Sequence, residues 1–235
     1  MGDLWDRVDE QPGGGIVRGG PAVSDVVARV ERGGALVAVA DEMGLGPADL
    51  ISALAHAGLG PATAPGPTLN QVPPGRPWLR PALEEGSLAD LLPGARRPAL
   101  LALSAGLLQI HDEWGASHEA AQEADDLGES ATSAYWHGIA HRREPDPGNA
   151  AYWFRRVGRN HPAFSPLAAA ARPLLDGHGD PGLASGLLAG GAWNSTAMID
   201  LCTRSQPGTP RASLARKLQR LEMIALLEVT VAPLL

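Results

Sequence analysis

The sequence predicts an all-α protein, a multi-helix bundle or globule with a small helix-turn-helix-like unit near its N-terminus. Two observations predict this fold class. Apolar residues recur at helical spacing along most of the chain, and no segment shows the strict alternation of apolar and polar residues typical of a half-buried strand. With 235 residues, the chain can bury roughly 70–75% of its unfolded surface. A core of that size needs no disulfide to fold.

Composition also indicates the compartment of the protein and the partners that it does not bind. The single cysteine, Cys202, rules out an intramolecular disulfide and favours a reducing compartment. No apolar run approaches the roughly 20 residues that a membrane-spanning helix needs, and the first ten residues do not resemble a signal peptide. We therefore expect a cytoplasmic protein that does not bind a membrane. The net charge of −7 argues against a nucleic-acid-binding protein.

The N-terminal quarter divides into a tail and a small helical unit. Residues 1–20 are acidic and then glycine-rich, which predicts a flexible tail. Residues 21–58 contain three helical patterns separated by glycines, the outline of a helix-turn-helix. The third pattern, from Pro47 to about Ala57, carries no Lys or Arg, and residues 1–60 hold four arginines against nine acidic residues. This balance excludes a DNA reader and favours a packing unit or a docking unit for a protein partner.

A proline-rich segment separates this unit from the rest. Residues 59–82 contain seven prolines, which predicts a linker or a segment draped over the surface. Residues 83–235 read as a helical, histidine-rich core domain. We expect one helix over 98–123, a polar loop over 124–131 and a helix from Thr132 or Ser133 to Glu144. The next helix is capped by Asp146 or Asn149, runs through Phe154 and is ended by Gly158. Further helices follow, at about 166–176, 182–189, 195–204 and 210–230.

Histidines are the most informative residues of the core domain. Five of the seven lie between His111 and His161. His137 and His141 are four residues apart, which places them on one face of a helix, about 6 Å apart. His111 and His118 are seven apart, two turns along a single helix. We expect Gly115 and Gly138, which lie between these histidines, to leave room for a cavity.

A helical hairpin folded at residues 127–128 would bring three of these imidazoles together. His118 would come level with His137 and His141, and His111 would come level with Glu144. Three protein ligands and one open position form a typical catalytic metal site. We expect His118, His137 and His141 to bind a divalent metal ion, Zn²⁺, Fe²⁺ or Ni²⁺, with His111 as a fourth ligand or an outer partner. Glu144 or Glu119 is the expected general base, or the orienting group for a ligand.

Arginines and aromatic residues surround this pattern. Five arginines fall within residues 142–159, and arginine offers a planar fork for carboxylate or phosphate groups. The alternative is ion pairing with the seven acidic residues of 112–129. Tyr152 and Arg156 are four apart and can face one pocket. We expect Tyr152 to take part in catalysis, and the substrate to be held by Arg142, Arg143, Arg155, Arg156 and Trp136.

One long motif carries a resemblance. Residues 135–146 (YWHGIAHRREPD), followed by 149–158 (NAAYWFRRVG), resemble an uncharacterised bacterial family of helical proteins. Residues 111–112, 117–118 and Gln122 are similar to it too, and the similarity spans about 98–228. The resemblance implies a helical fold and no particular activity.

These observations leave three functional hypotheses. The first is a metal-dependent enzyme of hydrolase or lyase type that acts on a small acidic molecule. The second is a non-catalytic assembly protein with structural histidines, which docks a protein partner through residues 21–58 or forms a homo-oligomer. The third is a metal-free enzyme in which histidine and glutamate act as acid and base.

Overall fold

The computed structural model describes residues 3–11 and 14–235. Within them the fold is all-α, as predicted, with one small sheet. The first eight helices of the chain are Val23–Glu31 (α1), Leu36–Met43 (α2), Pro47–Leu59 (α3), Arg80–Leu83 (α4), Glu85–Leu91 (α5), Arg97–Ile110 (α6), Trp114–Asp126 (α7) and Thr132–Arg143 (α8). The remaining α-helices are Pro147–Val157 (α9), Phe164–His178 (α10), Pro181–Leu187 (α11), Ser195–Arg204 (α12) and Pro210–Val231 (α13).

The N-terminal segment is structured where a flexible tail is expected. A 3₁₀ turn at Trp5–Arg7 leads into a hairpin of two antiparallel strands, Val8–Gln11 (β1) and Gly14–Val17 (β2). Trp5 is buried and its indole stacks on His56 of α3, with ring centroids 3.5 Å apart. This aromatic contact holds the N-terminal segment against α3, although the polar composition of the segment alone predicts that it is exposed. Residues 1–2 and 12–13 of the expected tail lie outside the described part of the chain.

The three helices expected within 21–58 are present as α1, α2 and α3. Helix α3 is buried along most of its length and packs against α1 and α6. Its Ser52 hydroxyl donates a hydrogen bond to the Leu4 carbonyl. The third helix is therefore part of the core.

The proline-rich segment forms a strap over the helices, which we define as residues 60–76. It contains no regular secondary structure. Arg216 and Gln219 of α13 donate side-chain hydrogen bonds to carbonyls of Gly66, Pro67 and Thr68. The strap is also bonded to the end of α8, where the Gln71 amide donates to the Arg143 carbonyl. These bonds hold an otherwise unpaired backbone against the core.

The single helix expected over 98–123 is in fact two helices, and that prediction is wrong. Helix α6 ends at Ile110, and Asp112 takes a left-handed backbone conformation with φ of 65°. Helix α7 starts afresh at Trp114. The break changes the direction of the chain between His111 and His118, so the two side chains no longer share a helix face.

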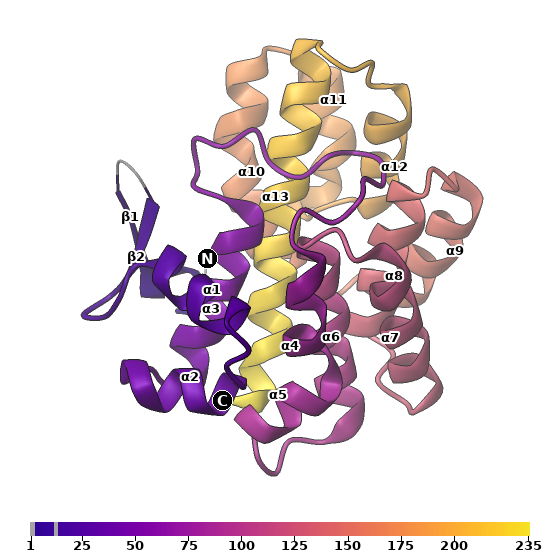
Figure 1. Cartoon of the computed structure of the whole chain (residues 1–235). Helices are drawn as coiled ribbons and strands as arrows, with labels where there is room; N and C mark the ends of the chain where they lie inside the picture. The colour runs from indigo at the N-terminus through magenta and orange to yellow at the C-terminus, as the bar shows by residue number, and fades with distance from the viewer. Residues whose placement is uncertain (1–2, 12–13) are drawn as a thin grey trace.

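Helix α13 organises the whole molecule. Figure 1 shows it running through the centre, with the N-terminal helices on one side and α8 and α9 on the other. It packs against α6, α8, α10 and α12. Helices α7 and α8 form the expected hairpin, with α9 packed against α8. This three-helix layer carries His118, His137 and His141.

Candidate metal centre

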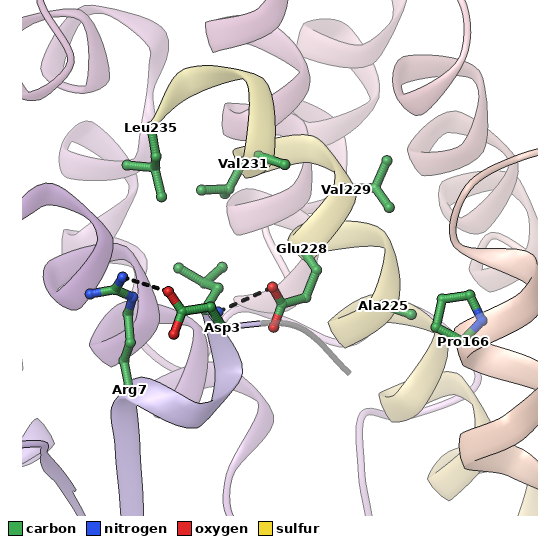
Figure 2. Close-up of a pocket in the computed structure, with 10 residues that line it drawn as sticks. Asp3, Arg7, Pro166, Ala225, Glu228, Val229, Val231 and Leu235 are labelled. Atoms are coloured by element: carbon green, nitrogen blue, oxygen red, sulfur yellow. Dashed lines mark hydrogen bonds and ion pairs between the residues drawn. The ribbon is translucent and has the colours of Figure 1, made fainter.

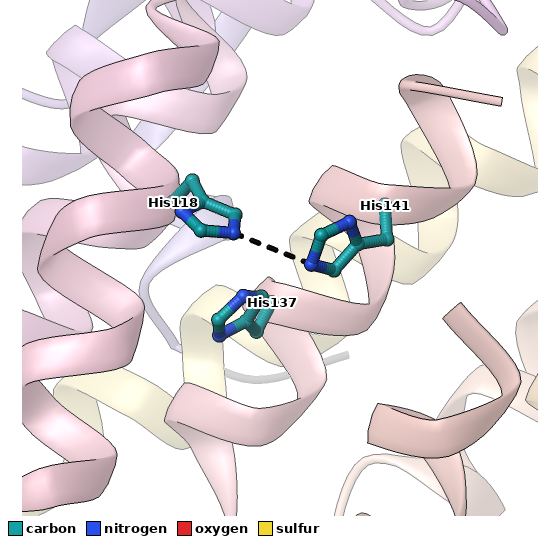
Figure 3. Close-up of side chains that lie close together, drawn as sticks. All are labelled: His118, His137 and His141. Carbon is teal, nitrogen blue, oxygen red and sulfur yellow. Dashed lines mark hydrogen bonds between the residues drawn. The ribbon is translucent and has the colours of Figure 1, made fainter. Parts of the chain in front are cut away.

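Three histidines converge between α7 and α8. His137 and His141 are one turn apart on α8, and His118 faces them from α7, as Figure 3 shows. One nitrogen from each imidazole lies within 4.8 Å of one from each of the others. The hairpin register predicted from the sequence is therefore confirmed for these three residues. They are close enough to bind one metal ion.

One pair of ring nitrogens has the spacing of tetrahedral coordination. His118 Nε2 lies 3.3 Å from His141 Nε2. Two imidazole nitrogens that each lie about 2.05 Å from a tetrahedral ion are about 3.3 Å apart. The His137 ring is stacked on that of His141, with centroids 4.9 Å apart, and meets the His118 ring edge-on at 4.3 Å. The three rings are already packed around one point.

His141 is oriented from outside by a carboxylate. Its Nδ1 lies 2.7 Å from Oε2 of Glu144, three residues later at the end of α8. A carboxylate on one ring nitrogen fixes the tautomer and leaves the other nitrogen free to bind a metal. Because Glu144 contacts Nδ1, on the side of the ring away from His118, it orients a ligand and does not reach the centre itself.

His137 is the most enclosed of the three. It is 1% exposed, and its ring is stacked on Trp153 of α9, with centroids 3.8 Å apart. Burial, together with His118, His141 and Arg156, lowers the pKa of His137 to about 3. Its buried Nδ1 has no hydrogen-bond partner among the described residues. An imidazole in this setting is neutral at physiological pH, the state that binds metal ions.

His118 forms the solvent side of the cluster. Its side chain is half-buried and stacks on Trp114, which donates a hydrogen bond from Nε1 to the Ala140 carbonyl. Burial and the neighbouring His141 lower the pKa of His118. His118 is therefore the member of the cluster that is most accessible to solvent.

A second group shares His141. The side chains of His141, Glu144 and Asp146 also offer three ligand atoms within 4.8 Å of one another. Both carboxylates are exposed, and Asp146 caps α9 by accepting a hydrogen bond from the Asn149 amide. Because both carboxylates are exposed and Asp146 is engaged in the cap, the three-histidine group is the better-formed site.

His111 lies outside the centre, so its expected role as a fourth ligand or outer partner is wrong. The break after α6 turns it towards α3, where its Nε2 lies 2.9 Å from the Leu54 carbonyl. Burial lowers its pKa to about 4. His111 is therefore a neutral core histidine that forms a hydrogen bond with the backbone of α3.

Two expected substrate contacts are enclosed in the core. The Arg142 guanidinium is fully buried and pairs with Glu222 of α13 at 2.6 Å. Trp136 is fully buried and donates from Nε1 to the Thr230 hydroxyl. Neither side chain reaches the solvent, so their predicted contact with substrate does not hold.

The Arg143 side chain also has partners within the protein. It pairs with Asp112 and donates hydrogen bonds to the carbonyls of Gln109 and Thr68. These contacts join the kink after α6, the end of α8 and the strap. Its predicted role in binding substrate therefore gives way to a structural one.

The remaining predicted residues are on the surface. Tyr152 is 46% exposed, and Arg155 is exposed. Arg156 lies over the Trp153 ring at 5.2 Å and forms two hydrogen bonds with Asp125 of α7. Glu119 is exposed on α7, beside His118 in sequence. Arg155 and Arg156 thus remain on the accessible side of α9.

Several residues of the site escape prediction from the sequence. Trp114 and Trp153 pack against the histidines, and Asn149 lies 3.1 Å from His141 Nε2. Asn149 and Trp153 both belong to the long motif at 135–158, which is the one signal that could have found them. Gly138 does not open a cavity. A Cβ there would lie 2.7 Å from the Phe154 ring, so this glycine lets α9 pack closely on α8.

None of the four described cavities is lined by His118, His137 or His141. The largest, about 670 Å³, lies between the strap and the start of α13 and includes Cys202, Thr209 and Arg216. Figure 2 shows another, of about 540 Å³, near the C-terminal end of α13. Its acidic side chains are already paired, Glu228 with the amides of Leu4 and Trp5 and Asp3 with Arg7.

Comparison with known proteins adds no relative. No protein-family model matches the chain. Neither the curated proteins nor the solved structures contain a match. The resemblance carried by residues 135–158 therefore remains a prediction. Among the described helices, none is long and apolar enough to cross a membrane.

Proposed function

We propose that this protein binds one divalent transition-metal ion through His118, His137 and His141 and uses it in a reaction of hydrolase or lyase type. The observation that carries the proposal is the convergence of three imidazole nitrogens within 4.8 Å of one another. Imidazole ligands suit Zn²⁺, Fe²⁺ and Ni²⁺.

The surroundings of the three histidines support a metal site over a structural polar core. His137 Nδ1 is buried and has no hydrogen-bond partner among the described residues, so a ligand or a water molecule is needed to satisfy it. When His141 Nδ1 holds its proton towards Glu144, its Nε2 has a free lone pair, and this atom and His118 Nε2, which faces it, can both coordinate one ion. The Glu144 contact is the outer arrangement that metal-binding histidines usually have.

Three protein ligands leave a position for water or substrate. A bound divalent ion lowers the pKa of its water to about 7 and polarises a carbonyl oxygen. His118 is partly exposed, so this position is reached from the solvent side. We assign recognition of a small acidic substrate to Arg155 and Arg156, because the other two predicted arginines are enclosed in the core.

Metal analysis of the purified protein tests the proposal. We expect one equivalent of Zn²⁺, Fe²⁺ or Ni²⁺ per chain, and Co²⁺ titration of the chelator-treated protein should give a tetrahedral visible spectrum. His137→Ala and His141→Ala should abolish stoichiometric binding. His178→Ala, at the far end of α10, is the matched control and should bind as the wild type does. A folded wild-type protein that binds no divalent metal would contradict the proposal.

Activity separates this proposal from the metal-free alternative. If a hydrolase or lyase activity is found, chelation should abolish it and the metal should restore it. An activity that resists chelation, with a pH profile set by imidazole, would favour metal-free catalysis by histidine and glutamate.

A further inference from the structure

We propose that the Asn149 carboxamide hydrogen-bonds the oxygen atom that occupies the open position of the metal centre, and that this centre therefore prefers carboxylate ligands. This inference rests on the proposed function, since it needs an ion bound to His118, His137 and His141. It adds a ligand-binding residue from α9 to a centre built by α7 and α8.

The backbone of Asn149 is fixed, while its side chain has no structural task. Asn149 lies in the first turn of α9, and its amide donates to Asp146 Oδ1, which caps the helix. The carboxamide takes no part in that cap. It is directed instead at His141, with Nδ2 at 3.1 Å from Nε2 and 3.3 Å from Nδ1.

These two similar distances show how the amide meets the ring. A hydrogen bond along the lone pair of one ring nitrogen would place the other nitrogen much farther away. The amide nitrogen thus lies about equally close to both ring nitrogens. It does not occupy the lone pair of Nε2. That lone pair still faces His118, so an ion can bind while Asn149 stays beside it.

The reach of the amide follows from these distances. An ion about 2.05 Å from His141 Nε2 lies at most about 5.2 Å from Asn149 Nδ2. An ion-to-oxygen bond followed by a hydrogen bond spans about 5 Å. The amide is therefore within reach of an oxygen atom bound to the ion. The position is half-buried, so water only partly screens the interaction.

The chemistry of the neighbourhood favours an anionic oxygen. A carboxamide N–H that donates to a charged oxygen forms a bond about twice as strong as one to a neutral oxygen. The same helix carries Arg156, which pairs with Asp125 through Nη2 and lies over the Trp153 ring that stacks on His137. Helix α9 thus brings an amide donor and a cation to one side of the cluster, the combination that recognises a carboxylate.

The test measures acetate binding to the Co²⁺-loaded protein from changes in its visible spectrum. Asn149→Ala keeps the Asp146 cap, which uses only the backbone. We expect it to bind Co²⁺ within about 2-fold of wild type and to weaken acetate binding by about 10-fold, because a hydrogen bond to a charged group is lost. Asn149→Asp should bind Co²⁺ more tightly and acetate more weakly than wild type, because it adds negative charge. A purely structural role would not move the two affinities in opposite directions.

Asn160→Ala, which changes an exposed asparagine just after α9, is the matched control and should leave both affinities unchanged. Unchanged acetate affinity in Asn149→Ala would overturn this inference alone, as would absent acetate binding by a wild type that holds Co²⁺. Loss of Co²⁺ binding in Asn149→Ala would also overturn it, since Asn149 would then be needed for the ion itself. A wild type that binds no Co²⁺ would overturn the metal centre.

Discussion

At the scale of single residues, the histidines of this chain divide by their partners. His118, His137 and His141 face one another, whereas His111 faces a backbone carbonyl. Residue type alone does not separate these four histidines. What each ring nitrogen faces decides the role of the histidine. Rings that face one another can bind an ion, whereas a ring that faces a carbonyl forms a hydrogen bond within the core.

The Glu144 carboxylate should set the affinity of the centre. Glu144→Gln removes the charge that holds the proton on His141 Nδ1. We expect metal affinity to fall about 10-fold, the usual effect of losing an outer partner of a metal-binding histidine. Calorimetric or Co²⁺ titration checks this. Glu119→Gln, an exposed neighbour of His118, is the control, and an equal loss in both variants would argue against the orienting role.

Burial of His111 should make stability depend on pH. Its folded-state pKa of about 4 lies below the unfolded value of 6.5, so only the unfolded chain takes up a proton between these values. The contribution of neutral His111 is fully present above pH 6.5 and is lost as pH falls towards 4, by about 3 kcal/mol in total. Urea unfolding of the wild type and of His111→Gln from pH 7.5 to 4.5 measures this. The variant should show a shallower decline, and parallel curves would contradict the prediction.

At the scale of elements, two glycines show how packing decides what a small residue does. Gly115 of α7 has open space beside it, whereas Gly138 of α8 lies under the Phe154 ring. The sequence presents both as glycines beside histidines. Only the α8–α9 contact distinguishes them, because it depends on where a third helix lies.

Alanine at these two positions should have opposite effects. Gly138→Ala places a Cβ 2.7 Å from the Phe154 ring, and we expect it to destabilise the fold by about 1–3 kcal/mol through overpacking. Gly115→Ala meets no atom and should stabilise α7 by up to about 1 kcal/mol. Thermal unfolding of the two variants checks both signs. Equal changes in melting temperature would show that α9 does not pack as closely as described.

At the scale of the whole molecule, α13 joins the histidine layer to the rest of the chain. The Arg142–Glu222 pair is the main polar link, and both side chains are fully buried. Tyr135 and Trp193 also donate hydrogen bonds to Glu222. This network fixes α8 against α13, and with it the positions of His137 and His141.

Removal of one partner of this pair should strongly destabilise the fold. Glu222→Ala leaves Arg142 buried without a counter-charge, and we expect a loss of about 3–5 kcal/mol in the free energy of unfolding. Glu84→Ala breaks the exposed pair with Arg80 and should cost at most about 1 kcal/mol. Chemical denaturation of both variants makes the comparison. Similar losses would show that Arg142 is not enclosed.

Sequence patterns alone predict the helical class, the helices from α8 to α13 and the convergence of three histidines. Each of these follows from local periodicity, from caps and breakers, and from one short loop that sets the register of a hairpin. The remaining features come from the tertiary structure. It anchored the N-terminal segment through the stacking of Trp5 on His56, and it broke the helix at Asp112. It also enclosed Arg142 with Glu222, eighty residues away. These features depend on contacts between residues distant in sequence, which periodicity cannot report.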